Sequence, residues 1–246
     1  EHLVSRENFA KAVEPDASLG DFLDSLPGYL AVDRLRELAE TMAVARAEGK
    51  RVLMGIGGHV IKVGLGPLLA DMVERGLITD LVLNGAAAIH DTEIALIGKT
   101  SEKVAETIVD GSFGMVAETA EIFSRVFQRG AEENRGLGRA LAEELLSGDY
   151  PHKDQSLVLR GVQAGAELTV HVALGTDTVH AVPGADGVAI GAATHNDFKR
   201  LAAVVADLSD GVYLNVGSAV LLPEVFLKSV SVARNLGHAV DNVTAA

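Results

Sequence analysis

The sequence predicts an α/β fold in which one doubly wound, mostly parallel sheet carries helices on both faces. Three observations support this prediction. The 246 residues suit one large domain better than two. Short apolar runs alternate with stretches of helical periodicity. Hydrophobic residues make up 48% of the chain, yet only 4% is aromatic and 26 residues are glycine. Small aliphatic side chains must therefore fill the core, as they do in parallel strands buried on both faces.

The first half of the chain supplies the first strands of this sheet. Leu35, Leu38 and Met42 fall on one stripe of a helix that ends at Gly49. We treat residues 1–50 as an N-terminal helical part and residues 51–246 as the α/β core of one domain spanning 1–246. The expected elements are a helix over 32–49, a strand over 52–54, a helix through 72–73, a strand over 81–83, a helix that starts at an N-cap on Ser101, and helices over 117–127 and 138–146.

The second half repeats the alternation of strands and helices. Its expected elements are a strand over 167–172, a polar loop over 173–180, an apolar run at 188–191, a helix over 196–206, a strand over 211–216, a turn at 217–218, a helix that includes Phe226, and an extended piece over 239–244. Because helices separate the strands, the strands are expected to run parallel.

Charge and composition exclude several classes of protein. The net charge of −13 argues against binding to nucleic acid or an anionic membrane, since phosphate contacts need clustered Lys and Arg. An acidic surface instead suits cationic substrates. The chain has no cysteine, which excludes disulfides and thiolate chemistry. No apolar stretch reaches the ~18 residues of a spanning helix, and we expect a cytoplasmic protein.

Small and polar residues follow the first two predicted strands. These residues are Gly57, Gly58, His59, Asn84, Gly85 and Ala86. Parallel strands joined by helices bind ligands beyond their carboxyl ends, where small residues let the backbone approach a phosphate or a ribose. We therefore expect a cofactor there. A plain glycine turn and close helix packing explain the same residues, and both alternatives stay open.

Ionisable residues follow the second strand at once. His90, Asp91 and Glu93 are candidates to bind a substrate or to transfer protons. The alternative role for Asp91 is the N-cap of a helix, with His90 merely beside it. Asp177 and His180, in the loop after a later strand, either face the same crevice or lie in a solvated turn.

The sequence gives little support for a bound metal ion. The residues considered as ligands are His59, His90, Asp91, His171 and His180. They lack a diagnostic spacing such as HExxH, so we expect no metal site.

The segment GHVIKVGLGPLLADMVERGLITDLVLNGAAAIHD, residues 58–91, resembles the deoxyhypusine synthase superfamily, whose NAD-binding fold is related to the Rossmann type. Residues 84–93 are also similar to a motif of the archaeal and cyanobacterial ornithine cyclodeaminase domain, G-N-A-x-A-x-H-D-x-E, with the opening Gly and Asn exchanged. The similarity covers most of the chain in order but is sharp only from Gly57 to Glu93.

The resemblance implies an NAD-dependent enzyme of the cytoplasm that acts on a small cationic amine and assembles as a homotetramer. In this reading NAD is held by Gly57, Gly58, His59, Asn84, Gly85, Ala86 and Asp177. His90, Asp91 and Glu93 bind the amine or move protons. Oxidation of a polyamine with aminobutyl transfer through an imine is the first expectation, and deamination of the ornithine cyclodeaminase type is the alternative.

Two departures from the family pattern favour a rival function. The imine-forming lysine of deoxyhypusine synthase belongs to a segment that follows the counterpart of residues 239–246, where this sequence stops. The histidine expected after the glycine turn is absent from residues 217–224. A nucleotide-binding module without catalytic turnover is therefore the second hypothesis.

Overall fold

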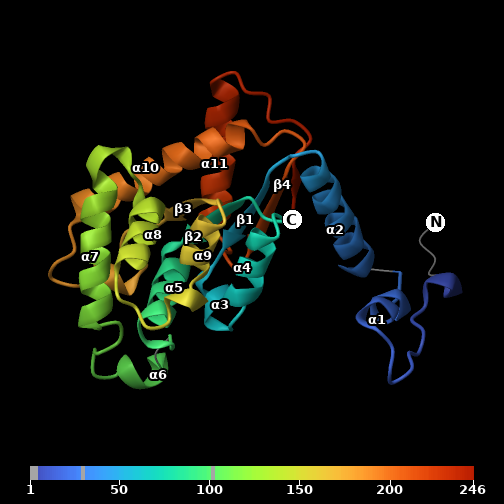
Figure 1. Cartoon of the computed structure of the whole chain (residues 1–246), viewed down its shortest axis with the longest axis horizontal. Coiled ribbons are helices and arrows are strands. Elements are labelled where there is room, and N and C mark those ends of the chain that lie inside the picture. The colour runs from blue at the N-terminus through green and yellow to red at the C-terminus, as the bar shows by residue number, and fades with distance from the viewer. Residues whose placement is uncertain (1–4, 29–30, 101–102) are drawn as a thin grey trace. The chain divides into compact units, whose positions relative to one another are not determined.

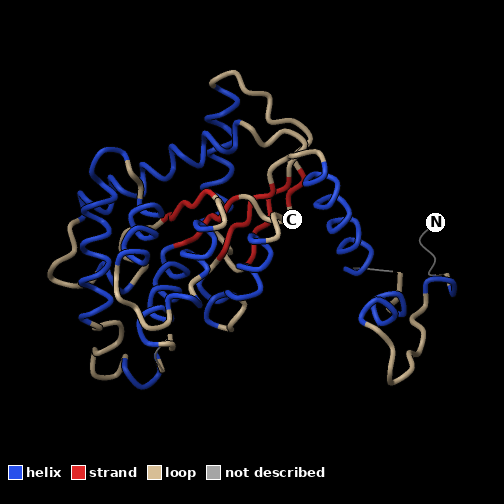
Figure 2. The backbone as a smooth tube through the Cα atoms, viewed as in Figure 1, coloured by secondary structure: helices blue, strands red, loops and turns tan. Residues whose placement is uncertain are grey.

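The computed structural model describes residues 5–28, 31–100 and 103–246 (Figures 1 and 2). The chain divides into two compact units, Glu1–Val44 and Ala45–Ala246. The single domain over 1–246 stays a prediction.

The first unit is helical. Its elements are the 3-10 helix η1 (Arg6–Asn8), helix α1 (Leu19–Ser25) and most of helix α2 (Ala31–Ala47). Ser18 starts α1 through a capping box: the Asp21 N–H donates to Ser18 Oγ at 3.1 Å, and the Ser18 N–H donates to the Asp21 carboxylate at 2.9 Å. The predicted helix over 32–49 is confirmed as α2.

The second unit is built on a five-stranded parallel sheet with the order β3-β2-β1-β4-β5. The strands are β1 (Val52–Ile56), β2 (Asp80–Asn84), β3 (Glu167–His171), β4 (Val212–Val216) and β5 (Thr244–Ala245). The chain moves outward from β1 to β3 and then crosses to the other side of β1 with β4. The carboxyl ends of β1 and β4 therefore flank a switch point, where open α/β sheets leave a crevice.

Helices cover both faces of this sheet (Figure 1). The helices that follow β1 are α3 (Gly58–Lys62), α4 (Gly66–Glu74), α5 (Gly85–Ile97), α6 (Val104–Thr107), α7 (Ala117–Ala131), α8 (Leu137–Ser147), α9 (Leu157–Gln163), α10 (Gly187–Ala206) and α11 (Leu221–Asn235), with the 3-10 turns η2 (Glu132–Asn134), η3 (Lys153–Gln155) and η4 (Thr178–His180). Leu53, Val82 and Tyr213 share a buried cluster with α10 and α11. On the other face Leu81 meets Gly161 of α9. The α/β class with a parallel sheet is thus confirmed.

Side chains of α10 occupy the outer edge of β3. The Val170 N–H donates to Asp197 Oδ2 at 2.7 Å, and the Val172 N–H donates to Thr194 Oγ1 at 3.1 Å. Asp197 Oδ2 also accepts the Gly138 N–H at 2.8 Å, at the start of α8. Burial raises the pKa of Asp197 to about 7.

Three predicted elements differ from the structure. The apolar run at 188–191 belongs to α10, because Asp186 accepts the Val188 N–H at 2.8 Å and starts the helix before it. The extended piece over 239–244 is reduced to β5, since Val240 and Asn242 have φ of 48° and 54°. The predicted N-cap Ser101 lies outside the described residues, and the helix after it is the short α6.

Within the described part of the chain, no helix is both long and apolar enough to cross a membrane.

Candidate functional site

Helices α3 and α5 begin side by side at the carboxyl ends of β1 and β2. A Cβ atom on Gly58 would lie 2.7 Å from the Ala86 Cβ and 3.2 Å from His90 Cδ2. Only glycine permits this approach, because real Cβ contacts are longer. The predicted residues Gly58, Ala86 and His90 are therefore brought together.

Glycines also join β1 to β4 at the switch point. The Gly57 N–H donates to the Val216 carbonyl at 2.8 Å, and a Cβ on Gly57 would lie 1.9 Å from the Gly217 carbonyl oxygen. Gly217 itself has a φ of 80°, in the region that favours glycine. Close backbone packing is thus one reason for glycine at this turn.

The start of α5 contacts the loop that follows β3. Asn84 caps this helix, since its Oδ1 accepts the Ala87 N–H at 2.9 Å. A Cβ on Gly85 would lie 2.0 Å from Asp177 Oδ2. A larger residue at Gly85 would therefore displace Asp177 whether or not a cofactor binds there.

His90 and Glu93 are linked through a residue that was not predicted, Thr100. The Thr100 hydroxyl donates to Glu93 Oε2 at 2.5 Å, and His90 Nδ1 lies 2.6 Å from the same hydroxyl oxygen. Because the hydroxyl has one proton and gives it to the carboxylate, Nδ1 must carry a proton and donate to Thr100. A neutral His90 then has its lone pair on Nε2, next to Cδ2, the ring atom that lies against Gly58.

A cavity of about 500 Å³ adjoins this chain of hydrogen bonds. Its wall combines aliphatic, hydroxyl and charged groups and consists of Glu93, Leu96, Ile97, Lys99, Thr100, Val116, Glu118 and Thr119. The Glu93 side chain is 19% exposed, so its carboxylate can exchange protons with water in the cavity.

Asp177 and His180 form a buried pair beside α5. His180 Nδ1 accepts the N–H groups of Gly175 at 3.2 Å and Asp177 at 3.4 Å, which places the ring proton on Nε2. Nε2 is buried, lies 3.9 Å from Asp177 Oδ2, and has no hydrogen-bond partner among the described residues. Burial raises the pKa of Asp177 to about 6, while the charge of His90 acts to lower it, and burial lowers the pKa of His180.

Asp177→Asn should therefore stabilise the protein at neutral pH. The pKa of the Asp177 carboxyl is 3.8 in the unfolded chain and about 6 in the folded protein. The wild type therefore loses stability as the pH rises from the first of these values to the second. Asparagine does not ionise, so the stability of the variant lacks this dependence on pH. The free energy of unfolding of Asp177→Asn relative to the wild type should rise by on the order of 2 kcal/mol from pH 4 to pH 7 and then stay level. Urea titrations at several pH values measure this, and a difference independent of pH would contradict the buried carboxylate.

Asp91 faces away from the His90 chain and joins α5 to α9. Its carboxylate accepts the Ser156 hydroxyl at 2.5 Å and the N–H groups of Leu157 at 2.7 Å and Val158 at 3.2 Å. The side chain is 1% exposed, and burial raises its pKa to about 6. Asp91 thus caps the start of α9, a structural role that the position after β2 does not reveal.

The other candidate histidines stand apart. His59 is exposed on α3. His171 is buried, with Nε2 3.0 Å from Thr169 Oγ1, and burial lowers its pKa to about 3. Among residues 5–28, 31–100 and 103–246, no three His, Asp or Glu side chains are arranged to hold a metal ion.

Sequence reasoning missed Thr100 and underrated His180. No spacing rule connects Thr100 to His90, because a turn after α5 returns it to the helix. His180 had a sequence signal, since it lies three residues after Asp177 in a polar loop.

No protein-family model and no curated protein matches the sequence. Solved structures are similar to it. The apo arginine dihydrolase ArgZ, from the ornithine-ammonia cycle in cyanobacteria, has a TM-score of 0.50 and 17% identity over 82% of this chain and 26% of its own. Unliganded AgrE has a TM-score of 0.50 and 13% identity over 90% of this chain and 32% of its own. A putative LOR/SDH protein from Methanococcus maripaludis S2 has a TM-score of 0.48 and 15% identity over 95% of this chain and 60% of its own.

The chain therefore spans about a quarter of ArgZ and a third of AgrE. At these identities the similarity shows a related α/β fold alone. Fold and site together define an α/β protein whose ionisable side chains gather beyond the carboxyl ends of a parallel sheet.

Proposed function

We propose that this chain is an NAD-dependent enzyme that oxidises a small cationic amine beyond the carboxyl end of its sheet. The observation that carries the proposal is the chain Glu93, Thr100 and His90, which holds the histidine in one tautomer while Cδ2 of its ring lies against Gly58. A neutral imidazole with a polar partner on Nδ1 is suited to act as a general base at physiological pH.

His90 Nε2 is the group that takes the proton from the substrate nitrogen. The ammonium nitrogen would lose one proton to Nε2, and NAD, when bound, would supply the acceptor for the hydride that leaves the amine carbon. The product is the protonated imine. The accepted proton then leaves through Nδ1 and the Thr100 hydroxyl to Glu93 at the wall of the cavity.

Asp177 is the candidate to hold the cationic nitrogen. Its carboxylate is buried next to Gly85, within electrostatic range of His90. The nearby His180 is neutral when its pKa is lowered, so it does not neutralise the carboxylate. An ammonium group would supply the missing positive charge. Asp177, predicted to hold the cofactor, therefore suits the substrate better.

We place NAD at the starts of α3 and α5, because both helices begin beyond the carboxyl ends of parallel strands. When bound, NAD supplies the acceptor for the hydride, and the protein supplies position and electrostatics. At Gly57 and Gly58 the place of a side chain is filled by the Gly217 backbone and by Ala86 and His90, so packing accounts for both glycines. We assign the pyrophosphate to this turn from its position after β1 at the switch point of the sheet. Because Asp177 lies at the start of α5, the phosphates fit better at the β1–α3 turn.

Two substrate classes are consistent with this site. Aminobutyl transfer from a polyamine, which resembles deoxyhypusine synthase, requires an imine-forming lysine, and Lys99 at the cavity wall is the candidate. Deamination of an ornithine-type amino acid requires no such lysine. The related fold of ArgZ, described as an arginine dihydrolase, makes arginine and ornithine the first amino acids to test.

The proposal is tested by titrating the protein with NADH and by measuring NADH formation from NAD with L-arginine, L-ornithine and spermidine. Saturable NADH binding with turnover of one amine supports it. Binding without turnover of any amine favours the non-catalytic nucleotide-binding module. No NADH binding overturns both.

Glu93→Gln should lower amine-dependent NADH formation by about 10- to 100-fold, because the amide keeps the hydrogen bond from Thr100 but cannot accept the proton. The melting temperature should stay unchanged. Glu118→Gln is the matched control, since Glu118 lines the same cavity without joining the Thr100 chain. Equal losses in both variants would point to the charge of the cavity rather than to a proton path.

A further inference from the structure

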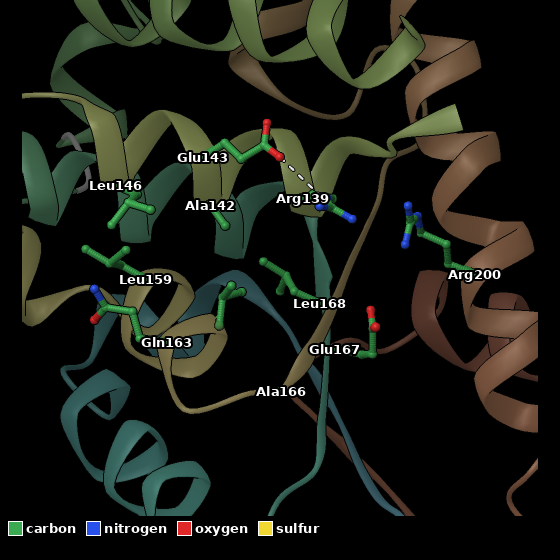
Figure 3. A pocket seen from close by; sticks show the side chains of 11 residues that line it. Arg139, Ala142, Glu143, Leu146, Leu159, Gln163, Ala166, Glu167, Leu168 and Arg200 are labelled. Atoms are coloured by element: carbon green, nitrogen blue, oxygen red, sulfur yellow. Dashed lines mark hydrogen bonds and ion pairs between the residues drawn. The ribbon is translucent and has the colours of Figure 1, made fainter. Parts of the chain in front are cut away.

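A second cavity, of about 380 Å³, lies between α8, α9 and α10 at the amino end of β3 (Figure 3). This size is within the range of small-molecule sites. Its aliphatic wall is formed by Ala142, Leu146, Leu159, Val162, Ala166 and Leu168. The charged ends of Arg139, Arg200 and Glu167 gather on the other side of the cavity. The cavity is therefore apolar at one end and carries both signs of charge at the other.

Arg139 is paired with Glu143, whereas Arg200 makes a long hydrogen bond in which its Nη2 donates to the Asn134 carbonyl at 3.5 Å. Arg139 Nε donates to Glu143 at 3.2 Å. Among the described residues, neither Arg200 nor Glu167 has an opposite charge within 4.0 Å, so the two are not paired with each other. Arg200 Nε is buried and has no hydrogen-bond partner within this part of the chain. Because Nε is buried, the donors available to a ligand are at the guanidinium end of Arg200, which Figure 3 shows at the edge of the cavity, and a bound carboxylate would accept from them.

We propose that this cavity binds a free α-amino acid with an apolar side chain. The carboxylate contacts Arg200, the ammonium group contacts Glu167, and the side chain lies against Leu159 and Leu168. A ligand with only one of these charges would leave the opposite group without a partner. The site is separate from the proposed catalytic groups, because it lies at the opposite end of β3 from the loop that carries Asp177.

The alternative to ligand binding is a structural role for Arg200, in which its charge stabilises the carboxylate of Asp197. The Asp197 carboxylate lies beneath the cavity, accepts the Gly138 and Val170 N–H groups through Oδ2, and leaves a buried Oδ1 without a partner. The positive charge of Arg200 favours its ionised form. If Arg200 served only Asp197, its removal would change stability but not ligand binding, and the experiment must separate these effects.

The test is isothermal titration of the full chain with L-leucine as the probe, compared with 4-methyl-2-oxopentanoate, which lacks the ammonium group, and with 3-methylbutylamine, which lacks the carboxylate. We expect saturable binding of L-leucine and at least about tenfold weaker binding of both analogues. Arg200→Gln and Glu167→Gln should each weaken L-leucine by roughly 10- to 100-fold. Lys199→Gln, which changes the exposed neighbour of Arg200 on α10, should have no effect.

Three outcomes overturn the proposal. One is the absence of L-leucine binding at millimolar concentrations. The second is L-leucine affinity in Arg200→Gln equal to that of the wild type, including the case where Arg200→Gln only lowers the melting temperature. The third is binding of 4-methyl-2-oxopentanoate or 3-methylbutylamine with the same affinity as L-leucine, which would show that the site does not require a zwitterionic ligand.

Discussion

Asp91→Ala is expected to lower the free energy of unfolding by about 3 kcal/mol, because three buried donors lose their acceptor together. These donors are the Ser156 hydroxyl and the N–H groups of Leu157 and Val158. Urea unfolding followed by circular dichroism measures the loss. Binding of NADH should be unchanged at temperatures where the variant is folded.

Asp91→Asn is the matched variant. It keeps one acceptor oxygen, and the raised pKa of Asp91 means that the folded site tolerates a neutral group. We expect Asp91→Asn to lower the free energy of unfolding by less than half as much as Asp91→Ala does. If Asp91→Ala unfolds like the wild type but loses amine turnover, Asp91 is a catalytic residue and the capping role is wrong.

His90→Asn should lower the kcat/KM for the amine by about 10²- to 10⁴-fold, the range that general-base catalysis contributes. The asparagine amide can still donate to Thr100 from the position of Nδ1, but the variant has no group at the position of Nε2. The structure should therefore be retained while the base is lost. Absorbance of NADH with the amine identified by the substrate panel gives the rate.

Thr100→Val provides the control for the proton path. It leaves the His90 ring in place and removes the hydroxyl between His90 and Glu93. We expect a loss of rate intermediate between those of the wild type and His90→Asn, because Nδ1 has lost its partner. A His90→Asn variant as fast as the wild type would exclude His90 as the base.

The sequence predicts the frame of the site because local patterns specify it. The apolar runs before Gly57 and Asn84 are buried strands, and the small residues that follow them start helices. Helical periodicity in the sequence also distinguishes the roles of three site residues. His90 and Glu93 are three residues apart on α5 and share a face, whereas Asp91 points elsewhere. In a helix that starts at Gly85, His90 and Glu93 share one face and Asp91 lies on another. Helical periodicity alone therefore distinguishes the proton-transfer pair from the capping residue.

The remaining contacts of the site depend on tertiary structure. Thr100 reaches His90 by a turn after α5, and Asp177 meets Gly85 from the loop after β3, more than 90 residues later in the sequence. The seven-residue α9 is too short for a clear periodic pattern. Ser156 accepts the Leu159 N–H and Asp91 holds the first turn, so a distant side chain helps fix this helix.

The side chains of α10 along β3 determine how copies of this protein can associate. An outer strand with free N–H groups is a template on which another chain can add a strand. Here Asp197 and Thr194 already accept the N–H groups of Val170 and Val172. The sheet therefore cannot be extended past β3 unless α10 moves away. If the chain forms the tetramer that its resemblance implies, the subunits must meet through surfaces other than this edge, and the same side chains protect β3 from aggregation by strand addition.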